Sequence, residues 1–222
     1  EKLGVQFVPD VTPYEKMKIR LLNAGHSTLG IPGAVHGHAT INACMEDKII
    51  ARFMREFMDQ EVTPILDEVQ GINLTEYKNN LEDRFSNPNI KDGVSRICSE
   101  SSAKLPKFLI PTLLENLETG GSIKYATFIL SVWGYYSAKE VDNKANEIEI
   151  LDARKEELHH AASGFEKDSI SFLRISDIFG DLLEKERFVK LYLKMSEALF
   201  NDSDIHKQIK LIFEDNYTLD LN

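Results

Sequence analysis

The chain has 222 residues, 42% of them hydrophobic, which is enough to bury one sizeable core. Its formal net charge of −10 argues against a nucleic-acid partner, because the phosphates would meet a repulsive surface. No stretch reaches the roughly 18 uninterrupted apolar residues of a membrane helix, and Cys44 and Cys98 form no C-x-x-C pair. These features predict one compact domain in the reducing cytoplasm, without a membrane partner.

The first eleven residues are expected to be extended. Leu3, Val5 and Phe7 alternate with polar or small residues, which predicts a short strand. The chain begins with glutamate, and no G-x-G-x-x-G follows a predicted strand anywhere in it. We therefore expect residues 1–11 to be a strand or linker left from a missing Rossmann-type nucleotide-binding domain, and residues 12–222 to be a separate helical domain.

The pattern of apolar residues predicts an all-α fold from residue 12 onwards. Thr12 and Pro13 indicate where the first helix begins, and the sequence GIPG at 30–33 is expected to break or kink it. Apolar residues at helical spacing then predict one long helix over 34–58. Further helices are expected at about 62–69, 75–85, 94–103, 106–117, 124–137, 144–162, 169–183, 186–200 and 203–213.

Three polar residues of the first predicted helix are spaced to line one pocket. Lys18, Asn23 and His26 follow the pattern Lys-x4-Asn-x2-His, which in an α-helix places them within an arc of about 140° and a rise of about 12 Å. A lysine can accept the proton of an alcohol, and an amide N–H can stabilise the developing alkoxide. The trio suits hydride transfer between an alcohol and a carbonyl. The spacing alone favours a solvated lysine, a cap and a core imidazole over catalysis.

Several longer blocks carry a family resemblance. The stretch PYEKMKIRLLNAGHS at residues 13–27 resembles the signature of the mannitol dehydrogenase family, the polyol-specific long-chain dehydrogenases and reductases. The segments RFSNPNIKD at 84–92, RICSESSAK at 96–104 and KFLIPT at 107–112 are similar to the substrate-binding segment of that family. SFLRISDIFGD at 171–181 resembles the family more weakly. The resemblance therefore spans most of the chain.

The resemblance implies a fold and a set of roles. The fold is the multi-helix C-terminal substrate and catalytic domain, similar to the helical domain of 6-phosphogluconate dehydrogenase. Lys18 is then the general base, Asn23 part of the oxyanion hole, and His26 a residue that orients the substrate. Arg96 and Lys104 are implied to donate hydrogen bonds to the sugar hydroxyls. The implied cofactor is NAD or NADP, bound mainly by the missing N-terminal domain, and no metal is implied.

The general-base role sets a condition on the lysine. A pKa of about 7 to 9 would let Lys18 accept a proton in oxidation and return it in reduction. Burial and the cations Arg96 and Lys104 are expected to lower the pKa of Lys18 from its ordinary value of about 10.4. Arg96 and Lys104, eight residues apart, would diverge by about 80° on one helix, so both can lean towards a common ligand.

The leading hypothesis is the catalytic domain of a polyol dehydrogenase that interconverts mannitol and fructose. Its partners are then the polyol substrate and its own nucleotide-binding domain, in an oligomeric state that the sequence does not predict. Reductases of the hexuronates fructuronate and tagaturonate, and sugar-phosphate dehydrogenases, share the same catalytic logic and are the alternatives within the family. A non-catalytic helical interaction module is the alternative of another class.

Other polar groups are expected to be structural. Side chains that are two residues apart on a helix point about 200° from each other, so His36 and His38 are not expected to share a metal ion. Arg84 is expected to support the turn that follows it, and residues 159–160 to lie at the surface. The charge run at 142–157 is expected to be a solvated helix face.

Overall fold

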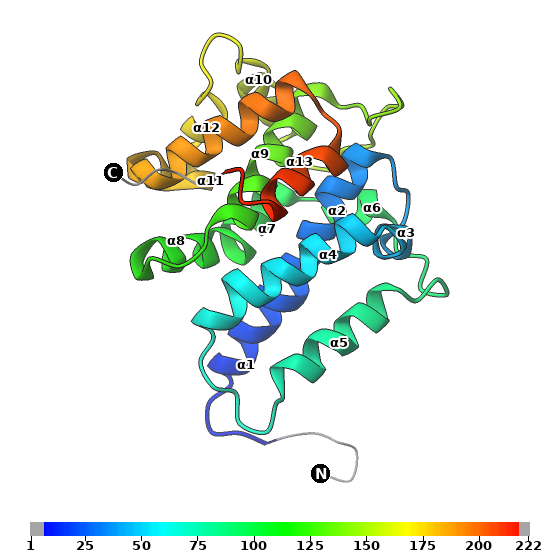
Figure 1. Cartoon of the computed structure of the whole chain (residues 1–222), viewed down its shortest axis with the longest axis vertical. Helices are drawn as coiled ribbons and strands as arrows, with labels where there is room; N and C mark the ends of the chain where they lie inside the picture. The colour runs from blue at the N-terminus through cyan, green and yellow to red at the C-terminus, as the bar shows by residue number, and fades with distance from the viewer. Residues whose placement is uncertain (1–6, 218–222) are drawn as a thin grey trace.

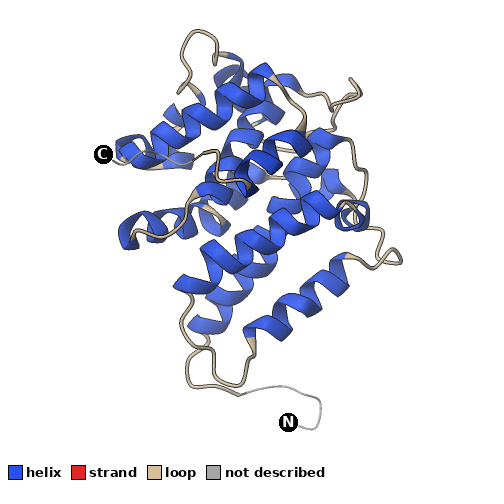
Figure 2. Cartoon of the chain, in the orientation of Figure 1, coloured by secondary structure: helices blue, strands red, loops and turns tan. Residues whose placement is uncertain are grey.

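The structure is a computed structural model that describes residues 7–217, and it confirms the all-α prediction (Figure 2). Within this range the only β-type pairings are two isolated antiparallel bridges. Leu3 and Val5, on which the N-terminal strand was predicted, lie outside the described residues. Phe7 belongs to no regular element and is 82% exposed. No helix among the described residues has both the length and the apolar character needed to cross a bilayer.

The helices follow one another with short connections. The α-helices are α1 (Thr12–Met17), α2 (Ala24–His36), α3 (Ile41–Glu46), α4 (Lys48–Phe57), α5 (Leu74–Phe85), α6 (Val94–Cys98), α7 (Ser101–Phe108), α8 (Ile110–Thr119), α9 (Lys124–Lys139), α10 (Lys155–Ser163), α11 (Ser176–Phe179), α12 (Glu186–Asn201) and α13 (Ile205–Phe213). Two π-helical segments, η1 (Lys18–Asn23) and η2 (Met58–Val62), and three 3-10 turns, η3 (Thr63–Ile65), η4 (Phe172–Arg174) and η5 (Leu182–Glu184), complete the described elements.

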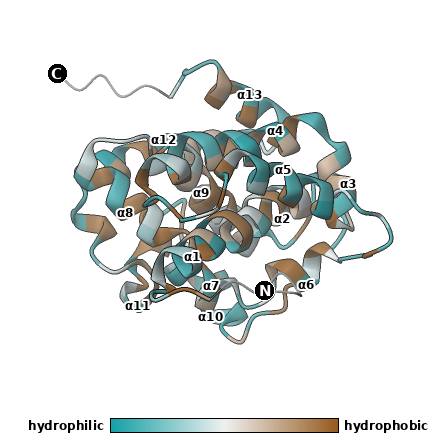
Figure 3. Ribbon diagram, turned by 90° about the horizontal axis from the view of Figure 1, so that it is seen from below, coloured by the Kyte–Doolittle hydropathy of each residue, from teal (hydrophilic) through white to brown (hydrophobic). Residues whose placement is uncertain are grey.

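Helices α2 and α9 form the buried centre of the fold, with the other helices around them (Figures 1 and 3). Helix α9 packs against α12, α10 and α2, and α2 also packs against α4 and α6. Every residue of α9 from Tyr125 to Ser137 is buried. Helix α2 is also buried over most of its length.

A buried carboxylate holds the start of α9. Glu61 is fully buried, and its two oxygens accept hydrogen bonds from the backbone N–H groups of Tyr125 (2.8 Å) and Ala126 (2.9 Å). The hydroxyl of Ser122 donates a further bond at 3.0 Å. Burial raises the pKa of Glu61 to about 7, against the lowering effect of these donors. Glu61 therefore caps the start of α9, although it belongs to a distant part of the chain.

The break predicted at residues 30–33 is wrong. Helix α2 continues through Pro32 as far as His36 and ends only at Gly37, whose φ is 94°. Residues Ala24, Gly25 and all of 27–35 are buried, so packing on every side stabilises the helix against the poor helix formers within it.

The single helix predicted over 34–58 is also wrong, because it is divided between α2, α3 and α4. Gly37 turns the chain with left-handed backbone angles that favour glycine. Asp47 then caps α4, where its Oδ1 accepts the N–H groups of Ile49 (3.0 Å) and Ile50 (3.3 Å). Local capping chemistry, rather than apolar spacing, decides where these helices begin and end.

Several further predicted helices are shorter than expected or divided. The region 62–69 holds only the end of η2 and the turn η3, and the helices predicted over 94–103 and 106–117 are α6, α7 and α8 instead. The helix predicted over 144–162 begins only at Lys155, because Asp142 Oδ1 accepts the N–H groups of Lys144 and Asn146 and holds a turn. Most residues of the charge run at 142–157 are exposed, as predicted, but over much of its length the run is a loop. The region 169–183 forms the short elements η4, α11 and η5 instead of one helix.

Candidate active site

A π-helical turn places the first two candidate residues on a common face. Lys18 and Asn23 are the first and last residues of η1, and the N–H of Ala24 bonds to the carbonyl of Ile19, five residues back. In such a turn, with about 4.4 residues per turn, residues five apart differ in direction by about 50°, whereas an α-helix would separate them by about 140°. Single π-turns within α-helices often occur at functional sites. The candidate base and the candidate amide are therefore closer in direction than α-helical spacing predicts.

His26 follows on α2 and packs against the ring of Phe85, with 4.3 Å between ring centroids. Burial lowers the pKa of His26 to about 4, and the charge of Asp92 opposes this shift. Three cations lower the pKa further: Arg84, Arg96 and Lys104. The imidazole is therefore neutral at physiological pH, and it can act as a hydrogen-bonding group but not as a cation.

A pocket of about 100 Å³ opens beside His26. Arg84, which the sequence predicted to be structural, lines this pocket together with Asp92 and Arg96. The other lining residues are Ile41, Asn42, Phe85, Asn87 and Ile90. Arg84 and Asp92 were missed as site residues, although both belong to the 84–92 segment that carries the family resemblance.

Arg96 is held in place by an acidic neighbour and by close helix packing. Its Nε and Nη2 donate to the two carboxylate oxygens of Asp92 at 2.6 and 2.5 Å. Helix α6, which carries Arg96, lies directly against α2 because Gly30 has no side chain. A Cβ at residue 30 would lie 2.9 Å from Cys98 Sγ and 3.2 Å from Ile97 Cγ2. This close approach brings Arg96 to the same pocket as His26.

Lys104 reaches the same region from α7. Its Nζ donates to the carbonyl of Ile97 (3.1 Å) and to the hydroxyl of Ser99 (3.4 Å). Burial lowers the pKa of Lys104. The structure brings His26 and Arg96 to one pocket, whereas Lys104 is not among the residues that line it. Both cations have partners within the chain.

Lys18 differs from its prediction. Its side chain is exposed in the described part of the chain, where the sequence predicted burial. Asn23 is half-buried and lies one π-turn after Lys18, at the end of η1. The trio therefore runs from the exposed Lys18, through Asn23, to the half-buried His26 at the pocket.

The domain is all-α, and the consecutive elements α1, η1 and α2 carry a lysine, an amide and an imidazole. The pocket beside the imidazole is lined by two arginines. These are the kinds of group that alcohol and carbonyl chemistry uses. The family described as "Mannitol dehydrogenase C-terminal domain" matches residues 10–200. The chain belongs to this family.

Its similarity to known proteins covers most of the chain. It is 39% identical over 194 residues to a mannitol 2-dehydrogenase of Neosartorya fischeri, which covers 86% of this chain and 38% of that protein. It is 35% identical over 206 residues to a mannitol 2-dehydrogenase of Aspergillus clavatus, which covers 91% of this chain and 41% of that protein. The chain thus spans less than half the length of these curated relatives.

Two solved structures share the fold. The ternary complex of Pseudomonas fluorescens mannitol 2-dehydrogenase with NAD and D-mannitol is similar with a TM-score of 0.90 and 36% identity, over 96% of this chain and 43% of that one. A D-sorbitol dehydrogenase in its substrate-free form is similar with a TM-score of 0.76 and 24% identity, over 94% of this chain and 43% of that one. The second likeness concerns the fold alone.

Proposed function

We propose that this chain is the substrate-binding and catalytic domain of an NAD-dependent mannitol 2-dehydrogenase, which interconverts D-mannitol and D-fructose. The observation that carries the proposal is the placement of Lys18 and Asn23 at the two ends of one π-turn, three residues before His26. The family membership and the 39% identity to a mannitol 2-dehydrogenase support it.

The three residues divide the work at the reacting carbon and its oxygen. In the oxidation of mannitol, Lys18 accepts the proton of the C2 hydroxyl, and in the reduction of fructose it returns that proton. The amide N–H of Asn23 donates to the same oxygen and stabilises the negative charge that develops on it. The neutral imidazole of His26 forms a hydrogen bond with a substrate hydroxyl and orients the carbinol carbon.

The remaining polar groups bind the rest of the sugar chain. Arg96 and Lys104, with Arg84 beside them, present N–H donors to the hydroxyls of an extended polyol. The bidentate pair of Arg96 with Asp92 fixes the plane of the guanidinium, which favours directional bonds to neutral hydroxyls.

The cofactor is proposed to bind mainly outside this chain. When bound, NAD accepts a hydride from the carbinol carbon. Residues 7–217 hold no strand on which a glycine-rich phosphate turn of the Rossmann type could be built. We propose that residues 1–11 lead from a nucleotide-binding domain into the helical domain of residues 12–222. An exposed Lys18 fits this arrangement, because a second domain would cover it and exclude water.

The same proposal includes NAD, and not NADP, as the cofactor. It also includes the cytoplasm as the location of the protein. The Pseudomonas fluorescens neighbour was solved with NAD, which supports NAD. Cys44 and Cys98 are both buried and unbridged, which supports a reducing compartment.

The test is a substrate panel with the complete protein that carries this chain. We expect kcat/KM for D-mannitol with NAD to exceed that for fructuronate, tagaturonate or a sugar phosphate with the reduced cofactor at least tenfold. A higher value for a hexuronate or a sugar phosphate would assign the chain to that branch of the family. A folded protein with no turnover on any of these substrates would instead favour the interaction module.

A further inference from the structure

A second pocket, of about 260 Å³, lies where the end of α2 meets α6, α9 and the loop that follows α9. The loop contributes three carboxylates to it, those of Asp142, Glu147 and Glu149. The other lining residues are Ala34, Gly37, His38, Ala39, Val94, Ser95, Tyr136 and Ile148. None of these residues lines the pocket beside His26, so the two sites are distinct.

The loop that carries the carboxylates is fixed against the centre of the fold. The N–H of Asn143 donates to the carbonyl of Val35 in α2 at 2.7 Å, and the N–H of Ile148 donates to the carbonyl of Glu140 at 2.8 Å. Ile148 is buried, whereas its two neighbours in the chain are the exposed glutamates of the pocket. The two glutamates are therefore presented by an anchored backbone.

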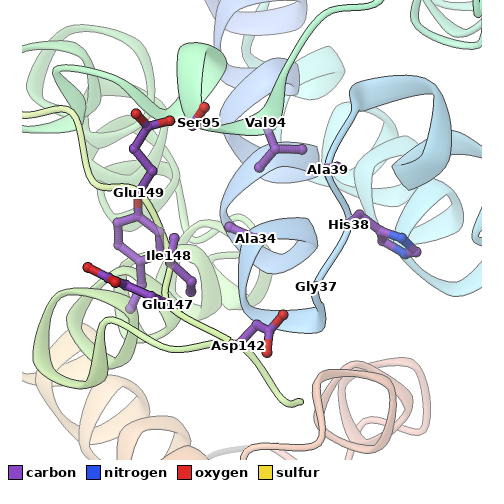
Figure 4. Close-up of a pocket in the computed structure, with 11 residues that line it drawn as sticks. Ala34, Gly37, His38, Ala39, Val94, Ser95, Asp142, Glu147, Ile148 and Glu149 are labelled. Carbon is purple, nitrogen blue, oxygen red and sulfur yellow. The ribbon is translucent and has the colours of Figure 1, made fainter. Parts of the chain in front are cut away.

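His38 lines the pocket without facing its carboxylates. Figure 4 shows its ring pointing away from them, and its Nε2 lies 3.0 Å from Asp47 Oδ2. The expectation that His36 and His38 point apart is wrong, because α2 ends between them and their ring centroids lie 4.9 Å apart. The imidazole of His38 is therefore engaged outside the pocket.

Two of the three carboxylates have no partner. Asp142 Oδ1 accepts the N–H of Lys144 at 2.8 Å. Asp142 Oδ2 and Lys144 Nζ lie 2.8 and 3.6 Å from the place where a Cβ of Gly37 would stand, so these opposite charges are close together. Glu147 and Glu149 form no hydrogen bond or ion pair with any other residue of 7–217. The pocket therefore keeps two uncompensated negative charges.

A buried hydroxyl without a partner accompanies these charges. Tyr136 lines the pocket and is only 2% exposed, and its hydroxyl has no hydrogen bond to the described part of the chain. Buried polar groups normally have a partner. Burial raises the pKa of Tyr136, and the charge of Glu149 is among those that raise it further, so the hydroxyl stays protonated. The combination points to a ligand that donates hydrogen bonds and carries positive charge.

The carboxylates are spread around an apolar floor. Figure 4 shows Glu149, Glu147 and Asp142 at separate positions, with Ala34 and Ile148 among them. None of the three carboxylates belongs to a group of possible metal ligands whose donor atoms lie within 4.8 Å of one another in the described residues. The pocket is therefore suited to an extended organic cation and not to a single metal ion.

We propose that this pocket binds a small linear alkyl diamine. One ammonium group pairs with Glu149 and the other with Glu147, in charge-assisted hydrogen bonds. The hydroxyl of Tyr136 accepts a further N–H, and the alkyl chain lies on Val94 and Ile148. The volume of about 260 Å³ suits such a ligand, since drug-sized molecules occupy roughly 300–1,000 Å³. The inference does not depend on the proposed function.

The test is a calorimetric titration of the complete protein with 1,4-diaminobutane, without mannitol or NAD. Two probes of the same chain length are the matched ligands. Butane-1,4-diol has no charge and should not bind, and 1-aminobutane should bind at least about threefold more weakly because it satisfies only one glutamate. The affinity for the diamine should fall as NaCl is added, since both glutamates are exposed.

Variants of the lining residues place the binding in this pocket. Glu147→Gln and Glu149→Gln should each weaken diamine binding by about threefold to tenfold. Tyr136→Phe should weaken it less, because it removes one hydroxyl. Glu118→Gln, at an exposed position of α8 outside the pocket, is the matched control and should bind as wild type. Circular dichroism checks that each variant folds, and the exposed glutamates keep the test valid if Tyr136→Phe does not.

Four results would overturn the proposal. The first is no binding of the diamine by the wild-type protein, and the second is equal affinity in the wild type and both glutamine variants. Equal binding of butane-1,4-diol would assign the pocket to neutral polyols instead. Tighter binding of Ca²⁺, added as CaCl₂ and lost in both variants, would assign it to a metal ion.

Discussion

Lys18 and Asn23 stand at opposite ends of one π-turn, where the N–H of the next residue bonds five residues back. The π-turn lies between the α-helices α1 and α2, so it changes the direction of the Lys18 side chain relative to the residues of α2. The proposed proton acceptor and oxyanion donor are thereby brought to one side of the rod. The following predictions depend on that relationship and on the packing around it.

Asn23→Ala is expected to lower kcat about a hundredfold to a thousandfold and to change KM little. An oxyanion donor forms its strongest bond in the transition state, so its loss affects turnover more than binding. The measurement is steady-state kinetics of mannitol oxidation by the complete protein. Asn80→Ala, at an exposed position of α5, is the matched control and should behave as wild type. A large rise in KM with unchanged kcat in Asn23→Ala would assign Asn23 to substrate binding instead.

Arg96→Ala is expected to raise KM about tenfold or more, with a smaller effect on kcat. The guanidinium donates to hydroxyls that are present in substrate and transition state alike. Asp92→Asn should have a weaker effect in the same direction, because it loosens the bidentate pair but leaves the guanidinium in place. The role is wrong if Arg96→Ala leaves KM unchanged.

His26 is expected to make the fold less stable in acid. Its pKa is about 4 in the folded chain and about 6.5 in the unfolded chain, so the unfolded state binds more protons between these values. The free energy of unfolding should therefore fall by up to about 3 kcal/mol as the pH drops from 6.5 to 4. Urea unfolding at several pH values measures this.

His26→Gln should flatten this part of the pH profile, while His160→Gln should not. A direct NMR titration of His26 should give a pKa well below 6. An ordinary pKa near 6.5 in the folded chain would contradict the burial and the cationic surroundings described for the imidazole.

Glu61→Ala is expected to destabilise the chain by about 2–4 kcal/mol, because two buried N–H groups at the start of α9 lose their acceptor. Glu61→Gln keeps one carbonyl oxygen and should cost less. The midpoint of urea unfolding reports both changes. A loss below about 0.5 kcal/mol in Glu61→Ala would show that these groups find other partners.

The fold was predictable where apolar spacing alone decides an element. The helices predicted over 124–137 and 186–200 match α9 and α12 to within two residues, because both are long, with α12 amphipathic and α9 apolar enough to be buried on all sides. The helix predicted over 34–58 failed at Gly37 and Asp47, where a left-handed residue and a capping carboxylate outweigh periodicity.

The sequence supplies a set of candidate site residues but does not reveal their geometry. The spacing of Lys18 and Asn23 does not reveal a π-turn, since the extra residue in the turn depends on packing against the rest of the fold. The contact between Asp47 and His206 spans 159 positions, so only the tertiary fold reveals it.

The most direct test of the proposed function is the pH dependence of mannitol oxidation by Lys18→Ala in the complete protein. With a lysine as general base, the wild-type rate should rise with pH through one ionisation. Lys18→Ala should abolish that dependence together with nearly all activity, and an added primary amine should restore part of the rate. A Lys18→Ala variant that keeps the normal rate and the same pH profile would show that another group is the base.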